Sequence, residues 1–298
     1  MLMVISNTLD IPKLRLNYFP NTTINKLLIL GDDTVIEEFE ENPEQISTLC
    51  ICGNRNSLLS FYNMADYISK FEYLNALSIP FFLIEKLKSG DIPNSVNVLK
   101  IDITEDFKQK DNNINWPTDV ILPNITSIIF SFCHTASRIS NLFGIHPHNF
   151  PNLRYLNCKL DKNGKILDYI KPFNHLSFLE VEHIGNNSLF DVIPDQLKNL
   201  IIVDTGRDFQ TNGISRIRSL EAVLFNSIKA EIDCSIFNSL SHLKELTIWN
   251  SKRITNIEAL LECKCLKKIS IINCGNPLKN LLHRFNEDRY EYLDIKYS

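Results

Sequence analysis

The chain has 298 residues, of which 44% are hydrophobic, and its formal net charge at pH 7 is −4. This length fits either two ordinary domains or one elongated array. So small a net charge gives no electrostatic reason to expect nucleic acid or an anionic membrane as a partner. The eight cysteines show no disulfide framework, and we expect reduced thiols.

The start of the sequence bears on where the protein works. Residues 1–13 lack the charged and apolar regions of a signal peptide. No apolar run approaches the roughly 18 residues that span a membrane. We therefore expect a cytoplasmic protein, while export to a host by a non-classical route stays open.

One pattern, apolar residues at offsets 0, +3 and +5, recurs along almost the whole chain. Its two most similar copies are Leu243/Leu246/Ile248 and Leu266/Ile269/Ile271. The other copies begin at Ile24, Ile46, Leu74, Val96, Ile125, Leu153, Leu176, Leu197, Leu220 and Tyr290. Successive copies start 21 to 29 residues apart. Because no such unit can bury its apolar face alone, we expect stacked repeats with one short parallel strand each.

This pattern resembles the leucine-rich repeat family, whose unit reads L-x-x-L-x-L-x-x-N/C. The resemblance implies an α/β fold: a right-handed solenoid (horseshoe) with a parallel concave β-sheet and a convex side of helices, 3-10 turns and loops. Residues 1–23 fall out of step, so we predict an N-terminal cap there and one elongated repeat domain of about 12 repeats over 24–298. Only three units carry Asn or Cys at offset +8, which predicts a broken hydrogen-bond ladder at that bend.

The segments that connect the predicted strands differ in composition. Residues 58–71 and 257–264 have helical spacing, whereas 105–117 have no clean period and predict a protruding loop. Prolines predict turns near the strand entrances at 92–95, 122–125, 150–153 and 193–197.

No constellation of residues indicates catalysis. The sequence contains no glycine-rich phosphate loop, no nucleophile elbow and no metalloprotease motif. His146 and His148 fit a turn better than a metal site, and Cys50 with Cys52 lacks the second pair that zinc usually requires. We therefore expect no enzymatic activity, no metal and no cofactor.

The strand pattern also predicts which residues form the open face of the sheet. Offsets +3 and +5 point into the core, so offsets +2, +4 and +6 point to the opposite side. In the family that the repeats resemble, this concave face usually binds the partner. Apolar residues beside adjacent glutamates indicate a protein-binding patch, although strands also carry scattered exposed aliphatics. The candidate partner-binding residues are Tyr155, Phe178, Glu180, Glu182, Ile201, Val203, Leu224, Asn226, Glu245 and Trp249.

The last predicted strand, Tyr290–Lys296, ends two residues before the sequence does, and no polar cap follows it. We expect its edge to be covered by strand addition from a partner or by a second copy in a homodimer. Alternatively, its tyrosines and lysines make the last coil tolerable in water.

These observations favour a non-enzymatic protein–protein recognition scaffold. It would be an effector or an immunity-type binder of one partner protein, with no nucleic acid or membrane partner. The alternative is an adaptor or substrate-receptor subunit of a larger complex such as a ubiquitin ligase. That role normally needs an additional recruiting module.

Overall fold

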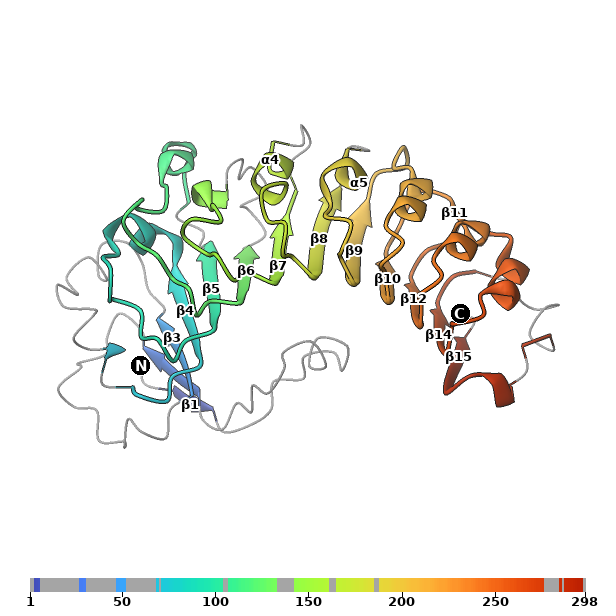
Figure 1. Cartoon of the computed structure of the whole chain (residues 1–298), viewed down its shortest axis with the longest axis horizontal. Coiled ribbons are helices and arrows are strands. Elements are labelled where there is room, and N and C mark those ends of the chain that lie inside the picture. The colour runs from blue at the N-terminus through green and yellow to red at the C-terminus, as the bar shows by residue number, and fades with distance from the viewer. Residues whose placement is uncertain are drawn as a thin grey trace. The chain divides into compact units, whose positions relative to one another are not determined.

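The computed structural model describes residues 3–5, 27–30, 47–51, 68–69, 71–103, 107–132, 142–160, 165–184, 188–275, 284–285 and 287–296. The chain divides into two compact units. Unit 1 comprises residues 1–138 and 143–153, and unit 2 comprises residues 139–142 and 154–298. In Figure 1, unit 1 runs from blue to green and unit 2 from yellow-green to red.

The described part of unit 1 is a mainly parallel sheet. Its strands are β1 (Met3–Ile5), β2 (Leu27–Leu30), β3 (Thr48–Ile51), β4 (Ala76–Pro80), β5 (Val98–Ile103) and β6 (Ser127–Phe132). Strands β2 to β6 pair in parallel in chain order. Strand β1 pairs antiparallel with β2, so part of the segment predicted to be a cap lies along the edge of the first repeat.

The described part of unit 2 is a parallel sheet of the same kind. Its strands are β7 (Tyr155–Lys159), β8 (Phe178–Ile184), β9 (Asn199–Thr205), β10 (Ala222–Asn226), β12 (Glu245–Trp249), β14 (Lys268–Ile272) and β15 (Tyr292–Lys296). They pair in that order. Two short strands of the connections, β11 (Ile232–Asp233) and β13 (Ile254–Thr255), pair with each other.

Short helices fill the connections. In chain order they are η3 (Phe81–Lys86), η4 (Gln109–Asn113), η5 (Leu142–Gly144), α4 (Leu167–Ile170), α5 (Leu189–Val192), η6 (Thr211–Arg216), η7 (Cys234–Ser239), η8 (Ile257–Glu262) and η10 (Glu287–Arg289). In unit 2, helices such as α4 and α5 lie on one side of the sheet and leave its other side open (Figure 1).

The strand register follows the apolar pattern. Leu246 pairs with Ile269 and Ile248 pairs with Ile271, and all four side chains are at most 1% exposed. A slip of one residue would turn these side chains to the open face, so their burial holds the register. Each predicted strand is present among the described residues. The predicted fold class, an α/β leucine-rich-repeat solenoid with a parallel sheet, is confirmed.

The turns predicted from the prolines are confirmed as well. Val96, Ile125, Leu153 and Leu197 each donate the backbone N–H to the carbonyl oxygen three residues earlier. These turns hold a proline in their first or second position, where its fixed φ favours the bend. Turns that contain no proline of their own keep the same hydrogen bond and bury an apolar residue at their start, as Phe173, Ile217 and Leu240 do.

Two connections differ from the sequence predictions. The protruding loop predicted over 105–117 is wrong at its end, because Trp116 is only 4% exposed. Its ring packs edge-on against Phe150 with 4.9 Å between centroids. The helix predicted over 257–264 is the 3-10 helix η8, which buries Ile257 and Leu260. The helix predicted over 58–71 lies largely outside the described residues.

Left-handed residues occur at the carboxyl ends of four successive strands of unit 2. Asp204, Ser227, Asn250 and Asn273 stand at offset +7 and have φ values of 51° to 58°. Short polar residues such as Asn and Asp adopt this conformation most readily, since their side chains form local hydrogen bonds. The sequence pattern did not reveal this position.

The bend turns the next residue, at offset +8, into the core. The Ser251 hydroxyl accepts a hydrogen bond from the N–H of Ile228 at 3.0 Å and donates one to the carbonyl of Trp249 at 2.8 Å. The Cys274 thiol donates to the carbonyl of Ile272 at 3.2 Å. The prediction of a broken hydrogen-bond ladder is therefore wrong at Ser251, because a serine hydroxyl can both accept and donate a hydrogen bond at this position.

Candidate functional site

The open face of unit 2 consists of three rows of side chains that cross strands β7 to β15. The first row is Tyr155, Phe178, Asn199, Ala222, Glu245, Lys268 and Tyr292. The middle row is Asn157, Glu180, Ile201, Leu224, Thr247, Ser270 and Asp294. The last row is Lys159, Glu182, Val203, Asn226, Trp249, Ile272 and Lys296. All ten candidate residues lie in these rows.

Burial divides the ten candidates into two groups. The buried ones are Tyr155, Phe178, Glu180, Ile201 and Leu224, all 8% exposed or less. The expectation that they face water is wrong, because side chains on strands about 4.8 Å apart cover one another. The partly exposed ones are Glu182, Val203, Asn226, Glu245 and Trp249. Four of these five belong to the last row, which is the most accessible of the three rows.

The buried candidates on β7 and β8 hold the face together. The Tyr155 hydroxyl donates a hydrogen bond to Glu180 Oε2 at 2.9 Å. Its ring packs edge-on against Phe178 with 4.6 Å between centroids. A carboxylate that is 1% exposed needs such a donor. These three residues therefore shape the sheet rather than offer contact surface.

The thiol of Cys158 lies on the core side of the same sheet. Burial, together with the charges of Glu180 and Glu182, raises its pKa far above the ordinary value. A thiol that stays protonated is a poor nucleophile and a poor metal ligand. Burial likewise raises the pKa of Cys263 to about 11, so neither cysteine is suited to chemistry.

The last row contains three partly exposed apolar side chains, with Asn226 between Val203 and the other two. Trp249 stands directly beside Ile272 by register, and Val203 lies two strands away. The indole N–H of Trp249 donates to Ser270 Oγ at 3.1 Å, which holds the ring in place. A tryptophan with its polar edge bonded and its ring partly exposed is typical of an interface anchor.

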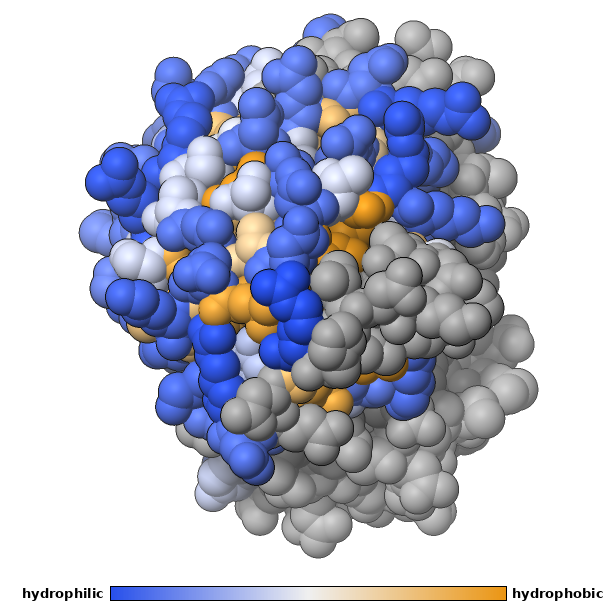
Figure 2. Space-filling model, turned by 90° about the vertical axis from the view of Figure 1, so that its right-hand side faces the viewer, coloured by the Kyte–Doolittle hydropathy of each residue, from blue (hydrophilic) through white to orange (hydrophobic). Residues whose placement is uncertain are grey.

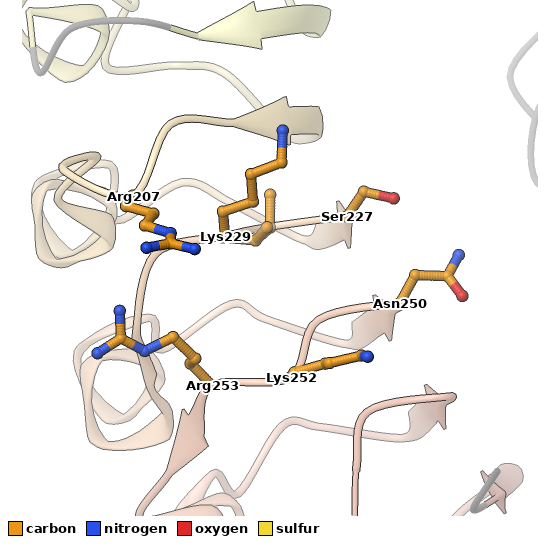
Figure 3. Close-up of a pocket in the computed structure, with 7 residues that line it drawn as sticks. Arg207, Ser227, Lys229, Asn250, Lys252 and Arg253 are labelled. Carbon is orange, nitrogen blue, oxygen red and sulfur yellow. The ribbon is translucent and has the colours of Figure 1, made fainter.

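A hollow of about 600 Å³ opens beside the last row, at the carboxyl ends of β9, β10 and β12. We call it the basic hollow; its lining residues are Arg207, Ser227, Ile228, Lys229, Asn250, Lys252 and Arg253. Figure 3 shows both guanidinium groups on one side, whereas the side chains of Ser227, Asn250 and Lys252 extend toward the other side. The sequence argument missed this hollow because it stopped at offset +8. The signal was a basic residue at offset +9 or +10 in three successive repeats.

Strand β15 lies at one end of the described sheet and pairs with β14. Leu293 and Ile295 occupy core offsets but are partly exposed, whereas Ile269 and Ile271 of β14 are fully buried. The Lys296 ammonium group lies 2.8 Å from Asp294 Oδ2. Seen from this end, the described surface is mainly hydrophilic with a few apolar patches (Figure 2).

The histidine pair and the cysteine pair considered as metal ligands in the sequence can be placed only in part. The N–H of His148 donates to His146 Nδ1 at 3.1 Å within a turn. No group of three or more potential metal ligands occurs among the described residues. Cys50 is partly exposed, and Cys52 lies outside the described residues. None of the described helices is both long and apolar enough to cross a membrane.

Comparison with known proteins gives limited information. No protein-family model matches the chain, and no curated protein sequence matches it. Among solved structures, an internalin from Listeria monocytogenes is similar at 15% sequence identity, over 91% of this chain and 73% of that chain, with a TM-score of 0.46. This similarity is too distant to carry any function over to the present chain.

Proposed function

We propose that this chain is a non-enzymatic protein–protein recognition scaffold and that a partner protein binds the last row of the open face. The observation that carries the proposal is that Trp249 and its neighbour Ile272, with Val203 beyond Asn226, are apolar and partly exposed in one row. The leucine-rich repeat resemblance and the parallel strand in each repeat support it. Partner proteins usually bind the open face in that family.

The order of residues along the last row supports an interface. Lys159 and Glu182 stand at one end and Lys296 at the other, with the apolar side chains between them. Protein interfaces commonly have such an apolar centre and a polar rim. Aliphatic residues exposed only through strand propensity would be scattered, whereas Trp249 and Ile272 are direct neighbours.

The test compares capture of partners from the native cell by the wild-type chain and by Trp249→Ala and Glu182→Lys variants. A partner identified by mass spectrometry is then purified, and its Kd is measured for each variant. Removal of an anchoring tryptophan should weaken binding by about 2 kcal/mol, or roughly 30-fold. Tyr73→Ala is the matched control, because Tyr73 is 64% exposed and lies in unit 1.

The effect of a Trp249 variant on folding must be separated from its effect on partner binding, since the Trp249 side chain also donates a hydrogen bond to Ser270. The Trp249→Phe variant keeps an aromatic ring but loses the indole donor, and it should retain most of the binding. If the Trp249→Ala variant keeps its Tm and binds the partner as tightly as the wild type does, the last row is not the binding surface. A one-to-one complex that blocks the partner's activity would fit an effector or immunity-type binder. Capture of a multi-subunit assembly would favour the adaptor role.

Strand β15 is a second proposed contact, either for a homodimer or for strand addition by the partner. The partial exposure of Leu293 and Ile295 supports it, because core side chains at a sheet edge gain from being covered. Sedimentation over a wide concentration range tests the homodimer. A single-chain mass at the highest concentration would exclude that version and leave strand addition.

A further inference from the structure

The cations of the basic hollow come from three successive connections of unit 2. Arg207 follows β9, Lys229 follows β10, and Lys252 and Arg253 follow β12. The repeat step brings these positions together, just as it aligns the rows of the open face. The hollow therefore concentrates positive charge on a chain whose formal net charge is −4.

Most of this charge has no carboxylate beside it. Lys229 is paired, with its Nζ 2.6 Å from Asp204 Oδ1. Arg207, Lys252 and Arg253 form no ion pair with any described residue, although other cations of unit 2 do, such as Lys244 with Glu221 at 2.7 Å. Like charges held together without counter-charges repel one another, so a bound anion would stabilise them.

The carboxylates nearest in sequence are engaged elsewhere or exposed. Glu231 accepts a hydrogen bond from Thr255 Oγ1 at 3.2 Å. Asp233 accepts from Asn256 Nδ2 at 3.0 Å and from the Ser235 backbone at 2.9 Å. Asp208 is exposed and does not line the hollow.

Backbone hydrogen bonds hold the floor of the hollow. Ser227 and Asn250 occupy the left-handed bends. Their N–H groups donate to the carbonyls of Trp249 at 2.9 Å and Ile272 at 3.0 Å. Ile228 between the cations is only 2% exposed. The backbone therefore needs no reordering when a ligand binds, and the entropy cost falls on the exposed lysine and arginine side chains.

We infer that the basic hollow binds an acidic segment of the same protein partner that covers the last row, an inference that rests on the proposed function. The two surfaces are continuous, because Ser227 and Asn250 directly follow Asn226 and Trp249 in the chain. Arginine forks bind carboxylates through paired hydrogen bonds. A volume of about 600 Å³ accommodates several side chains rather than one small anion.

The composition of the lining favours a protein segment over a nucleic acid. Sites for single-stranded nucleic acid combine cations with aromatic side chains on which bases stack. The lining contains serine, isoleucine and asparagine beside the cations, and no aromatic residue.

The test measures binding of a fluorescent hexaglutamate peptide to the whole chain at low salt, with a hexaglutamine peptide as the neutral control. Hexaglutamate should bind, and its affinity should fall as salt is raised. Arg207→Ala and Arg253→Ala should each weaken it by about tenfold. Arg218→Ala is the matched control, since Arg218 is exposed in the turn before β10, at the opposite end of the strands.

Three results would overturn the inference. These are equal binding of hexaglutamine, an equal loss in the Arg218→Ala variant, or tighter binding of a single-stranded oligonucleotide with six phosphates. Tyr73→Ala, an exposed position of unit 1 outside both surfaces, should leave hexaglutamate binding unchanged. Arginine-dependent peptide binding without any Trp249-dependent partner would refute the proposed function and leave only an acidic-peptide site in the hollow. A Trp249-dependent partner that ignores Arg207→Ala and Arg253→Ala would refute only this inference.

Discussion

The two units build the same repeat with different regularity. In unit 1 the repeats start 22 to 29 residues apart, whereas in unit 2 they start 21 to 24 residues apart. Unit 1 fills its connections with aromatic rings: Phe81 packs against Phe82, Phe107 and Phe143 with centroids 5.0 to 6.1 Å apart. The strand register thus tolerates connections of unequal length when each connection supplies its own core.

Regular spacing has a second consequence in unit 2. Lys198 and Lys244 flank Glu221 at 3.0 and 2.7 Å, because all three stand at offset +1 of successive repeats. At the bends, Asn273 donates its side-chain N–H to Asn250 Oδ1 at 2.7 Å. Because the repeats of unit 2 have nearly equal length, residues at the same offset line up on neighbouring strands. This alignment also produces the last row and the basic hollow. The last row, the basic hollow and the edge of β15 therefore all lie in the more regular unit.

The largest effect should come from breaking the aromatic core of unit 1. Phe81→Ala removes a fully buried ring with three aromatic neighbours and should lower the free energy of unfolding by about 3–5 kcal/mol. Urea unfolding measures the total loss, and hydrogen exchange identifies the unit that opens first. We expect unit 1 to lose protection.

Milder variants sharpen the same comparison. Phe225 in unit 2 is also fully buried, but its contact is with Phe237 at 6.1 Å between centroids. Phe225→Leu should therefore cost less than about 1.5 kcal/mol, and Phe81→Leu should cost more. Tyr73→Ala, on the surface, should stay within about 0.5 kcal/mol. Equal losses for the two leucine variants would show that the aromatic cluster has no special role.

The next effect concerns how tightly the connections pack. In unit 2, a Cβ at Gly213 would lie 2.3 Å from Cδ2 and 2.8 Å from Cγ of Phe190, so the ring would have to move. Gly213→Ala should destabilise the protein by up to about 3 kcal/mol. In unit 1, Gly90 has no atom near its Cβ position but has a φ of 92°. Gly90→Ala should cost only about 1 kcal/mol through backbone strain. Calorimetric Tm values test this order, and the reverse order would contradict it.

The sequence predicted the strands, the core and the turns because these depend on period-2 burial and on proline. It did not predict what depends on neighbouring repeats. Tyr155 and Glu180 are buried by side chains of adjacent strands, which a pattern along one strand does not contain. The basic hollow requires knowledge of where the chain goes after the left-handed bend at Ser227 and Asn250. Trp116 is buried because Phe150, distant in sequence, offers it a surface.

A smaller effect tests the bend of unit 2. Ser251→Ala would leave the buried N–H of Ile228 without its side-chain acceptor and should cost at least about 1 kcal/mol. Ser251→Cys should cost less, because the Cys274 thiol occupies the equivalent position of the next repeat and accepts a hydrogen bond from the Ser251 backbone there. Urea unfolding of the two variants provides the measurement. Equal stability of the wild type and the alanine variant would show that water takes over the bond.

The smallest effect is the pH dependence of stability that comes from the ion pairs of Glu221 with Lys198 and Lys244. Hydrogen bonds from Lys244 and Lys198 hold the pKa of Glu221 below its usual 4.5. A carboxyl whose pKa is lowered on folding stabilises the folded state above the unfolded pKa, and this contribution disappears as the pH falls through the folded pKa. Glu221→Gln should therefore lose less Tm than the wild type between about pH 6 and about pH 3. The difference should shrink in concentrated salt, because Glu221 is only partly buried and exposed ion pairs are screened. If Tm falls equally with pH in the two proteins at low salt, the ion pairs of Glu221 do not stabilise unit 2.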